Sequence, residues 1–255
     1  MKKNKMKAKL KAGEPVFGFT VGGDWPEIVE VLGICGCDYV WIDGQHGVFG
    51  LPEIANLVRA AEASDITPVA RVPGTDRGAI LSYLDLGVQG IIVPDVQTRE
   101  QAETIVEWTK FHPEGMRGLG YGHYADYHLV RSFAETYAHS NEETAIILQC
   151  ESKEGLDNLD EIVKVTGVDC IMMGPMDLSQ SLGITGQFDN PIHKEAMAQA
   201  RRICKDAGMP VGEICWDGDF ARERVAEGVQ FSNYGAIDLL INGLKDYMDK
   251  AKAGS

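Results

Sequence analysis

The chain has 255 residues and carries a formal net charge of −14 at pH 7. Its composition, 44% hydrophobic and 24% charged, is typical of a globular protein with a sizeable core, and its length fits a single α/β barrel. The acidic balance argues against nucleic acid or an anionic membrane surface as the main partner, and no apolar run approaches the roughly 18 residues of a membrane span. A small anionic substrate stays compatible with this charge, because it responds to the local field of its site.

Residues 1–13 form a basic lead-in. The segment is rich in lysine and has no apolar stretch behind it, so it is not a secretory signal. A solvated first helix fits this pattern better than an RNA- or lipid-binding tail. The six cysteines show no zinc-ligand spacing, which is typical of reduced, buried thiols. We therefore expect a cytoplasmic protein that binds neither nucleic acid nor a membrane.

Short apolar runs alternate with helical patterns along the whole chain. The runs are too short for ordinary helices, are bounded by Gly, Pro or Asp, and predict eight strands. The predicted strands are Val16–Val21, Tyr39–Ile42, Pro68–Val72, Gly90–Val93, Ala145–Cys150, Cys170–Met173, Pro210–Cys215 and Val229–Ser232. The predicted helices are Pro26–Gly33, Pro52–Ala63, Asp76–Leu86, Arg99–Lys110, Lys153–Thr166, Pro191–Ala207, Phe220–Ala226 and Ile237–Ala251.

This order of elements predicts a (β/α)8 barrel. Eight βα units of about 30 residues account for the whole chain and leave no linker for a second domain. We therefore expect one barrel domain over residues 1–255, in preference to a doubly wound open sheet, which usually has fewer strands. The stretch from Phe111 to Thr144 is far longer than a usual connection and is rich in Gly, Tyr and His, so we expect a lid or a binding loop there.

Polar side chains follow several of the predicted strands. In barrels of this kind the chemistry lies at the C-terminal ends of the strands. The residues at those ends are Asp43, His46, Arg71, Asp95, Glu151 and Asp177.

Glu151 and Asp177 end adjacent predicted strands, so their carboxylates should meet in one cleft. Two carboxylates that close repel each other, and a divalent cation would remove the conflict. Oxygen ligands favour a hard ion such as Mg²⁺ or Mn²⁺. The alternative is that one carboxylate pairs with Arg71 and the other caps a helix.

Arg71 lies between apolar residues within a strand, where an arginine is costly unless it is paired. It either pairs with a protein carboxylate or awaits an anionic substrate. His46 lies three residues after Asp43 in a turn flanked by glycine, and its ordinary pKa near 6.5 suits proton exchange. A histidine held by loop backbone is the structural alternative.

The same residues lie in motifs that resemble one known family. The motifs are Trp41-Ile-Asp-Gly-Gln-His-Gly, Pro68-Val-Ala-Arg-Val, Ile92-Val-Pro, Met116-Arg-Gly-Leu-Gly, Leu148-Gln-Cys-Glu-Ser and Met173-Gly-Pro-Met-Asp-Leu-Ser. In this order they are similar to the HpcH/HpaI aldolase/citrate lyase family, and more narrowly to its 2,4-dihydroxyhept-2-ene-1,7-dioate (4-hydroxy-2-oxo-acid) aldolase branch. The resemblance extends from about Phe17 to Gly235.

The resemblance implies a barrel of the phosphoenolpyruvate/pyruvate type and a class II aldolase. Such an enzyme cleaves a 4-hydroxy-2-oxo acid to pyruvate and an aldehyde with a divalent metal, Mg²⁺ or Mn²⁺ with Co²⁺ as a further candidate, and with no organic cofactor. By this resemblance, Glu151 and Asp177 are metal ligands.

The resemblance also implies roles for the other site residues. Arg71 contacts the pyruvate oxygens and steadies the enolate, while His46 with Asp43 moves protons. Gln149 supports the metal site. The substrate carboxylate is bound by the backbone of a four-residue segment, namely Gly174, Pro175, Met176 and Asp177. No predicted strand end carries a lysine, which counts against a Schiff-base mechanism.

Several alternatives stay open at this point. They are a 2-dehydro-3-deoxyglucarate aldolase, an oxaloacetate decarboxylase, a CoA-ester lyase and a metabolite-binding barrel without activity. Gln45 stands where the family motif has glutamate, and Cys150 where a β-branched residue is usual. The resemblance further implies a homo-oligomer, a hexamer or trimer of dimers, in which the C-terminal helix (residues 237–251) is exchanged between subunits.

Overall fold

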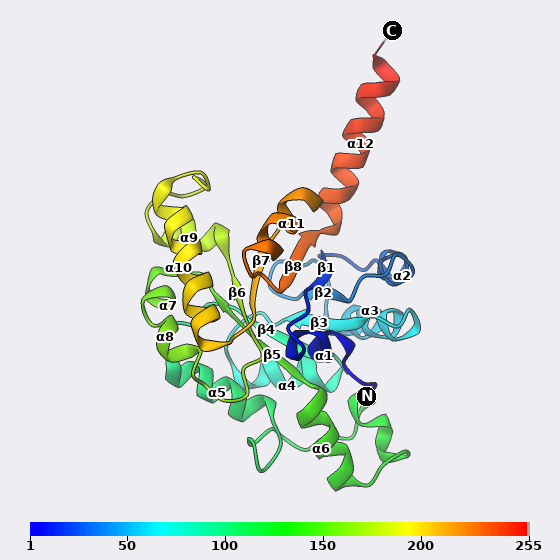
Figure 1. Cartoon of the computed structure of the whole chain (residues 1–255). Coiled ribbons are helices and arrows are strands. Elements are labelled where there is room, and N and C mark those ends of the chain that lie inside the picture. Colours follow the sequence, from blue (N-terminus) through cyan, green and yellow to red (C-terminus); the bar gives the residue numbers. More distant parts are fainter. Residues whose placement is uncertain (254–255) are drawn as a thin grey trace.

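A computed structural model of the chain describes residues 1–253. Within this range eight parallel strands close into a barrel in the order β1 to β8, with helices around it, which confirms the predicted (β/α)8 fold (Figure 1). The strands are β1 Val16–Val21, β2 Tyr39–Asp43, β3 Thr67–Arg71, β4 Gly90–Val93, β5 Ala145–Cys150, β6 Cys170–Met173, β7 Val211–Ile214 and β8 Phe231–Gly235. The helices are α1 Lys5–Lys11, α2 Pro26–Ile34, α3 Leu51–Ala63, α4 Arg77–Asp85, α5 Arg99–Thr109, η1 His123–His128, α6 Phe133–Glu143, α7 Lys153–Asp157, α8 Leu159–Ile162, α9 Pro175–Ser181, α10 Pro191–Ala207, α11 Gly218–Ala226 and α12 Ala236–Lys252.

Alternate residues of each strand belong to two separate cores. On β2, Tyr39 and Trp41 pack in the cluster that fills the barrel, whereas Val40 and Ile42 pack in the cluster between barrel and helices. This follows from the two-residue period of a strand. The barrel interior is therefore a packed core, and barrels of this kind carry their chemistry beyond the C-terminal ends of the strands.

The first helix closes the N-terminal end of the barrel. Met6 and Leu10 of α1 are buried in the interior cluster, and the buried Lys7 lies 3.0 Å from Asp169 through its Nζ atom. The Asn4 side chain caps the helix by accepting from the amide of Lys7. The expected helix forms, but the expectation that it is solvated is wrong, because its apolar residues are four apart and so share one face.

The segment from Phe111 to Thr144, between β4 and β5, is not the lid or binding loop that was expected. It contains η1 and α6, and it packs against the N-terminus: Asp126 accepts from the Met1 ammonium at 2.9 Å, and Glu143 accepts from the Asn4 amide at 2.6 Å. These contacts place it at the opposite end of its own barrel from the strand C-termini. It is therefore not a lid over its own site.

Two further helical segments differ from the prediction. The single helix expected at Lys153–Thr166 is two short helices, α7 and α8, separated at Asn158, whose ψ of 1° departs from helical geometry. The segment after β6 forms α9, which was not predicted because only Gly174 separates the end of the strand at Met173 from Pro175. A proline in the first turn of a helix is well tolerated.

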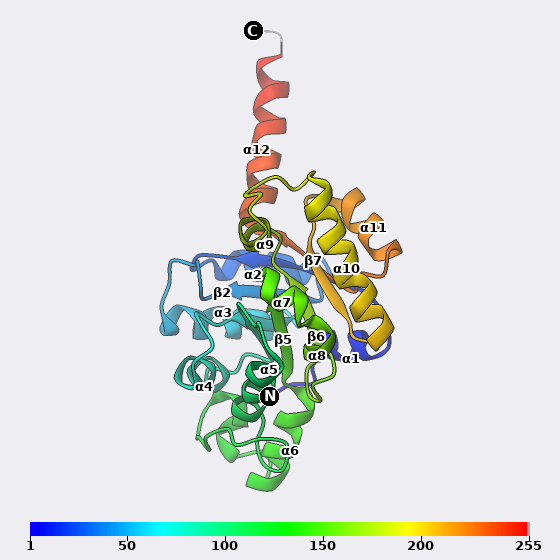
Figure 2. The ribbon, with the colours of Figure 1, turned by 90° about the vertical axis from the view of Figure 1, so that its left-hand side faces the viewer.

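The C-terminal helix α12 projects away from the barrel (Figures 1 and 2). None of its described residues is buried, although one side carries large apolar side chains. These are Leu239, Leu240, Ile241, Leu244, Tyr247 and Met248. Across residues 1–253, no helix has the length and apolar character needed to cross a membrane.

The position of α1 predicts that Leu10→Ala lowers the free energy of unfolding. Removal of a buried leucine side chain from a packed interior costs about 2–5 kcal/mol. Urea unfolding of this variant and of Lys11→Ala, whose side chain is exposed, measures the effect. Equal stability of both variants would show that α1 is not part of the core.

Candidate active site

The polar residues expected at the strand ends gather around one cavity. It has a volume of 450 Å³ and is bounded by the β2–α3 loop, the residues after β4 and β5, and α9. Its lining residues are Gln45, His46, Asp95, Glu151, Ser152, Asp177, Gln180 and Ser181. Closure of the barrel in chain order brings these segments together.

Glu151 is a buried carboxylate held by neutral donors. Its Oε1 atom accepts from the Asp95 amide at 2.9 Å, and its Oε2 atom accepts from the Gln149 side-chain amide. Burial raises the pKa of Glu151 to about 7, and the negative charge of Asp177 adds to the rise, against the opposing effect of the Asp95 hydrogen bond. Gln149 therefore positions the carboxylate.

Asp177 lies in the first turn of α9, not at the end of β6 where it was expected. The strand stops at Met173 and the chain turns into the helix through Gly174 and Pro175. A Cβ atom on Gly174 would lie 2.4 Å from the Glu151 Oε2 atom, so only glycine allows α9 to begin this close to that carboxylate. The alternative in which Asp177 caps a helix is wrong for α9, because the N-cap residue of that helix is Gly174.

Arg71 is paired with Asp43 in a two-pronged ion pair. Its Nε atom donates to Asp43 Oδ1 at 2.8 Å and its Nη2 atom donates to Oδ2 at 2.6 Å. The two residues are register partners on adjacent strands, and the guanidinium lies 5.3 Å from the centre of the Trp41 ring. Of the two interpretations of Arg71, pairing with a protein carboxylate is confirmed, but its partner is neither Glu151 nor Asp177.

The charge of Arg71 also affects its partner. Burial acts to raise the pKa of Asp43, but the hydrogen bonds and positive charge of Arg71 outweigh it, and the pKa is lowered overall. Asp43 Oδ1 further accepts from the amides of Gln45 and His46, at 3.1 and 3.3 Å. Asp43 therefore stays ionised and organises both the arginine and the turn.

His46 is exposed and lines the same cavity as Glu151 and Asp177. Among the described residues its ring has no hydrogen-bond partner, and only its backbone amide is held, by Asp43. The structural alternative, a ring tied to loop backbone, is therefore not what the structure shows. The ring is free to meet a ligand in the cavity.

The donor set suits a hard divalent cation. Two carboxylates share the cavity, and the buried Oε1 atom of Gln149 has no hydrogen-bond partner among residues 1–253. A second group of possible ligands, His139 with Glu142 and Glu143, lies within 4.8 Å of one another elsewhere. There Glu143 already accepts from the Asn4 amide, so this second group serves to hold the N-terminus.

Three residues that line the site were not predicted from the sequence. Ser152, Gln180 and Ser181 line the cavity, and the backbone amide of Asp95, rather than its side chain, holds Glu151. The helical period of α9 would have placed Gln180 near Asp177, since residues three apart share a face. That signal was hidden because α9 itself was not predicted.

The model of the HpcH/HpaI aldolase/citrate lyase family matches residues 17–241. The chain belongs to this family. It is therefore an aldolase-type carbon–carbon lyase.

Relatives with known names or structures align with this chain over almost its full length. The hydroxypyruvate/pyruvate aldolase of Roseobacter denitrificans is 34% identical and is covered over 98% of both chains. The 5-keto-4-deoxy-D-glucarate aldolase of Shigella boydii is 34% identical over 91% of this chain and 90% of its own. A crystal structure of a family member from Burkholderia cenocepacia has a TM-score of 0.92 and 28% identity, with 98% of this chain and 99% of that chain covered.

The raised pKa of Glu151 predicts how the stability of the metal-free protein depends on pH. Between the ordinary pKa of 4.5 and about 7, the folded state holds a proton that the unfolded state releases. The free energy of unfolding should therefore fall as pH rises through this window, by on the order of 3 kcal/mol. Glu151→Gln, which cannot ionise, should lack this fall. Urea unfolding in the presence of a chelator compares the two, and parallel pH profiles would contradict the assignment.

Proposed function

We propose that the chain is a class II aldolase that reversibly cleaves a 4-hydroxy-2-oxo acid to pyruvate and an aldehyde. The observation that carries this is the shared cavity of Glu151 and Asp177, next to a positive charge at Arg71 and a free imidazole at His46. The name of the Roseobacter denitrificans relative supports pyruvate as one of the two products. The proposal of an aldehyde as the other product rests on the resemblance to the 2,4-dihydroxyhept-2-ene-1,7-dioate aldolase branch.

Glu151 and Asp177 would hold a divalent metal, Mg²⁺ or Mn²⁺ with Co²⁺ as a further candidate. Two carboxylates leave room for water and for the oxygens of a 2-oxo acid, which is the usual pattern for Mg²⁺. When bound, the ion supplies a Lewis acid for the electrons released by carbon–carbon cleavage. No organic cofactor is required.

The first residues of α9 would bind the carboxylate of the 2-oxo acid. The N–H groups of a helix's first turn have no partner within the helix, and they carry partial positive charge. Here these are the amides of Met176 and Asp177, presented by the turn through Gly174 and Pro175. The substrate would thus lie between α9 and Arg71.

Arg71 would stabilise the negative charge that develops on C2–C3 of the substrate. A fixed positive charge at that point lowers the barrier because it needs no reorganisation. Asp43 holds two of its nitrogens in place, and its Nη1 atom has no partner in the described part of the chain. Asp43 thus acts by positioning Arg71 and the His46 turn, which is a narrower role than the proton transfer implied by the resemblance.

His46 would take the proton of the C4 hydroxyl and return it in the reverse direction. Its ring lines the cavity without a protein partner, so it can reach a substrate or a water there. Cleavage would leave an aldehyde and a pyruvate enolate, and C3 of the enolate would take a proton back from the protonated His46, directly or through water, to give pyruvate.

A 2-dehydro-3-deoxyglucarate-type substrate is the second candidate. It is favoured by the Shigella boydii relative, which is named for such a sugar acid. Oxaloacetate decarboxylation and CoA-ester cleavage would use the same arrangement. The substituted position Gln45 lines the cavity and so bears on which acceptor fits.

We also propose a homo-oligomer, a hexamer or trimer of dimers, in which α12 is exchanged. The helix projects from its own barrel and exposes Leu240 and Leu244, while Trp25 and Ile28 of the adjoining surface are exposed too (Figure 1). A second copy of the chain would cover both apolar surfaces. The cytoplasmic location stays a prediction.

The proposed function predicts that chelation, Glu151→Ala or Asp177→Ala abolishes pyruvate release and leaves the barrel folded. Loss of a direct ligand should lower activity by more than the about 10–100-fold that is typical when a residue that only supports a metal ligand is replaced. A pyruvate-coupled assay over a panel of 4-hydroxy-2-oxo acids, with Mg²⁺, Mn²⁺ or Co²⁺, measures it. Glu154→Ala, an exposed carboxylate three residues away, is the matched control. Full activity after exhaustive chelation would refute the proposal.

Arg71→Lys should lower kcat by about 10²–10³-fold, because lysine keeps the charge but loses the two-pronged contact with Asp43. The free energy of unfolding should change far less than the activation barrier. Steady-state kinetics and urea unfolding of the same preparation separate the two effects. Unchanged kcat would exclude the role given to this residue.

A further inference from the structure

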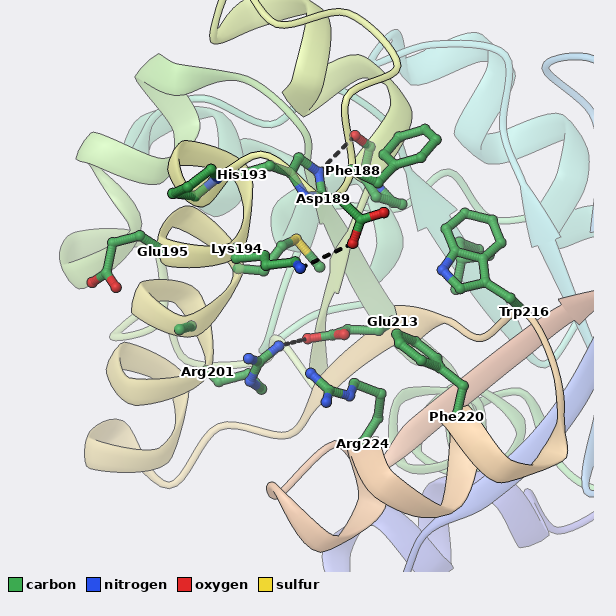
Figure 3. Close-up of a pocket in the computed structure, with 15 residues that line it drawn as sticks. Phe188, Asp189, His193, Lys194, Glu195, Arg201, Glu213, Trp216, Phe220 and Arg224 are labelled. Atoms are coloured by element: carbon green, nitrogen blue, oxygen red, sulfur yellow. Dashed lines mark hydrogen bonds and ion pairs between the residues drawn. The ribbon is translucent and has the colours of Figure 1, made fainter.

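A larger cavity lies outside the barrel wall. It has a volume of 1120 Å³ and is bounded by α10, α11, β7 and the loops that precede the two helices (Figure 3). Among the described residues, none lines both this cavity and the cavity that contains Glu151 and Asp177, although Pro175, from the turn proposed to bind the substrate carboxylate, lines the larger one. The size is ample for a small organic ligand, for which about 300–1,000 Å³ is usual.

One wall of this cavity carries a buried charge. Gly212 of β7 faces the barrel interior, where it adjoins Met172 and Phe231, so the next residue, Glu213, points out toward α10. The Glu213 side chain is only 3% exposed and accepts from Arg201 Nη1 at 2.6 Å. Burial of a charged pair between barrel and helix carries a larger desolvation penalty than an apolar contact would. The Arg201–Glu213 pair therefore gives the cavity one polar end.

Arg224 of α11 brings a second guanidinium to that end. Its Nη2 atom donates to Glu227 at 2.8 Å, and Arg201 Nη2 contacts the same carboxylate at 3.2 Å. The Nε atom of Arg224 is buried and has no acceptor among residues 1–253. A buried charged donor without an acceptor is costly, and a carboxylate placed there would satisfy it.

The other end of the cavity is aromatic. The rings of Phe188 and Trp216 lie 5.7 Å apart, and Phe220 lies between Trp216 and Arg224 in the close-up view (Figure 3). Arg224 stacks 4.9 Å from the centre of the Phe220 ring. An aromatic ligand packs well against such flat surfaces.

We propose that this cavity binds an aryl carboxylate, a small acid with one aromatic ring. The carboxylate accepts from Arg224 Nε, and the ring packs against Trp216 and Phe220. None of the described residues of α11 is buried, so this side of the cavity is accessible from solvent. The site does not depend on the metal or on the aldolase reaction.

Titration with 3-phenylpropanoate tests the site in the full chain. Trp216 should give a saturable fluorescence change that Trp216→Phe removes, while calorimetry still detects binding to that variant. Arg224→Gln should weaken binding about tenfold or more, the usual effect of losing a charged hydrogen bond. Arg222→Gln is the matched control, because Arg222 lies on the same helix, is 78% exposed and does not line the cavity.

Two further comparisons decide the chemistry. Arg224→Lys keeps a cation for Glu227 but lacks the Nε donor, so it should weaken binding as Arg224→Gln does, without loss of folding. The alcohol 3-phenylpropanol lacks the carboxylate, and 3-cyclohexylpropanoate lacks the aromatic ring, so both should bind more weakly. Absence of saturable binding, equal affinity of the alcohol, or equal affinity of the Arg224 and Arg222 variants would overturn the proposal.

Glu151→Gln separates this site from the proposed aldolase site. The variant should still bind 3-phenylpropanoate with unchanged affinity, even though it is expected to lose pyruvate release. Loss of 3-phenylpropanoate binding in Glu151→Gln would show that the acid binds at the strand ends, and the second site would then be wrong.

Discussion

The site depends on one electrostatic constraint, a buried carboxylate beside another carboxylate. Glu151 is held by the Asp95 amide and the Gln149 side chain, both neutral, and Asp177 lines the same cavity. The nearby cation, Arg71, is committed to Asp43. Burial of the Glu151 carboxylate, to which the negative charge of Asp177 adds, outweighs these hydrogen bonds and the positive charge of Arg71 and raises the pKa to about 7, so the protein only partly compensates a negative charge there. A divalent cation would compensate it.

The fold maintains this arrangement from several directions. Pairing of β2 with β3 sets Asp43 beside Arg71, which fixes the positive charge at the rim. Gly174 lets α9 start against Glu151, where any side chain would collide with the carboxylate. Helix α1 closes the other end of the barrel, so that the strands form a rigid base for the site.

Much of this arrangement could be predicted from the sequence. Seven of the eight strands were predicted within one residue of their observed bounds, because short β-branched runs between glycines have few other interpretations. The last strand was predicted at Val229–Ser232 and lies at Phe231–Gly235, because its polar second half gave no apolar signal. The pairing of Arg71 with Asp43 was not predicted, since it depends on the register of two strands, which a single sequence does not reveal. Asp177 was assigned to a strand end because the short turn through Gly174 and Pro175 was taken as the end of the strand and not as the start of α9. Ser132 and Glu135 form the capping box that begins α6. This start signal was missed because the glycine- and tyrosine-rich stretch before it led us to expect a loop.

Direct measurement of Mn²⁺ binding tests the central claim most closely. Calorimetric titration of the metal-free chain should show one Mn²⁺ site, and Glu151→Gln and Asp177→Asn should each remove it while the circular dichroism spectrum stays that of the folded barrel. Glu154→Gln should bind as the unaltered chain does. Unchanged Mn²⁺ affinity in both ligand variants would show that Glu151 and Asp177 are not the metal site.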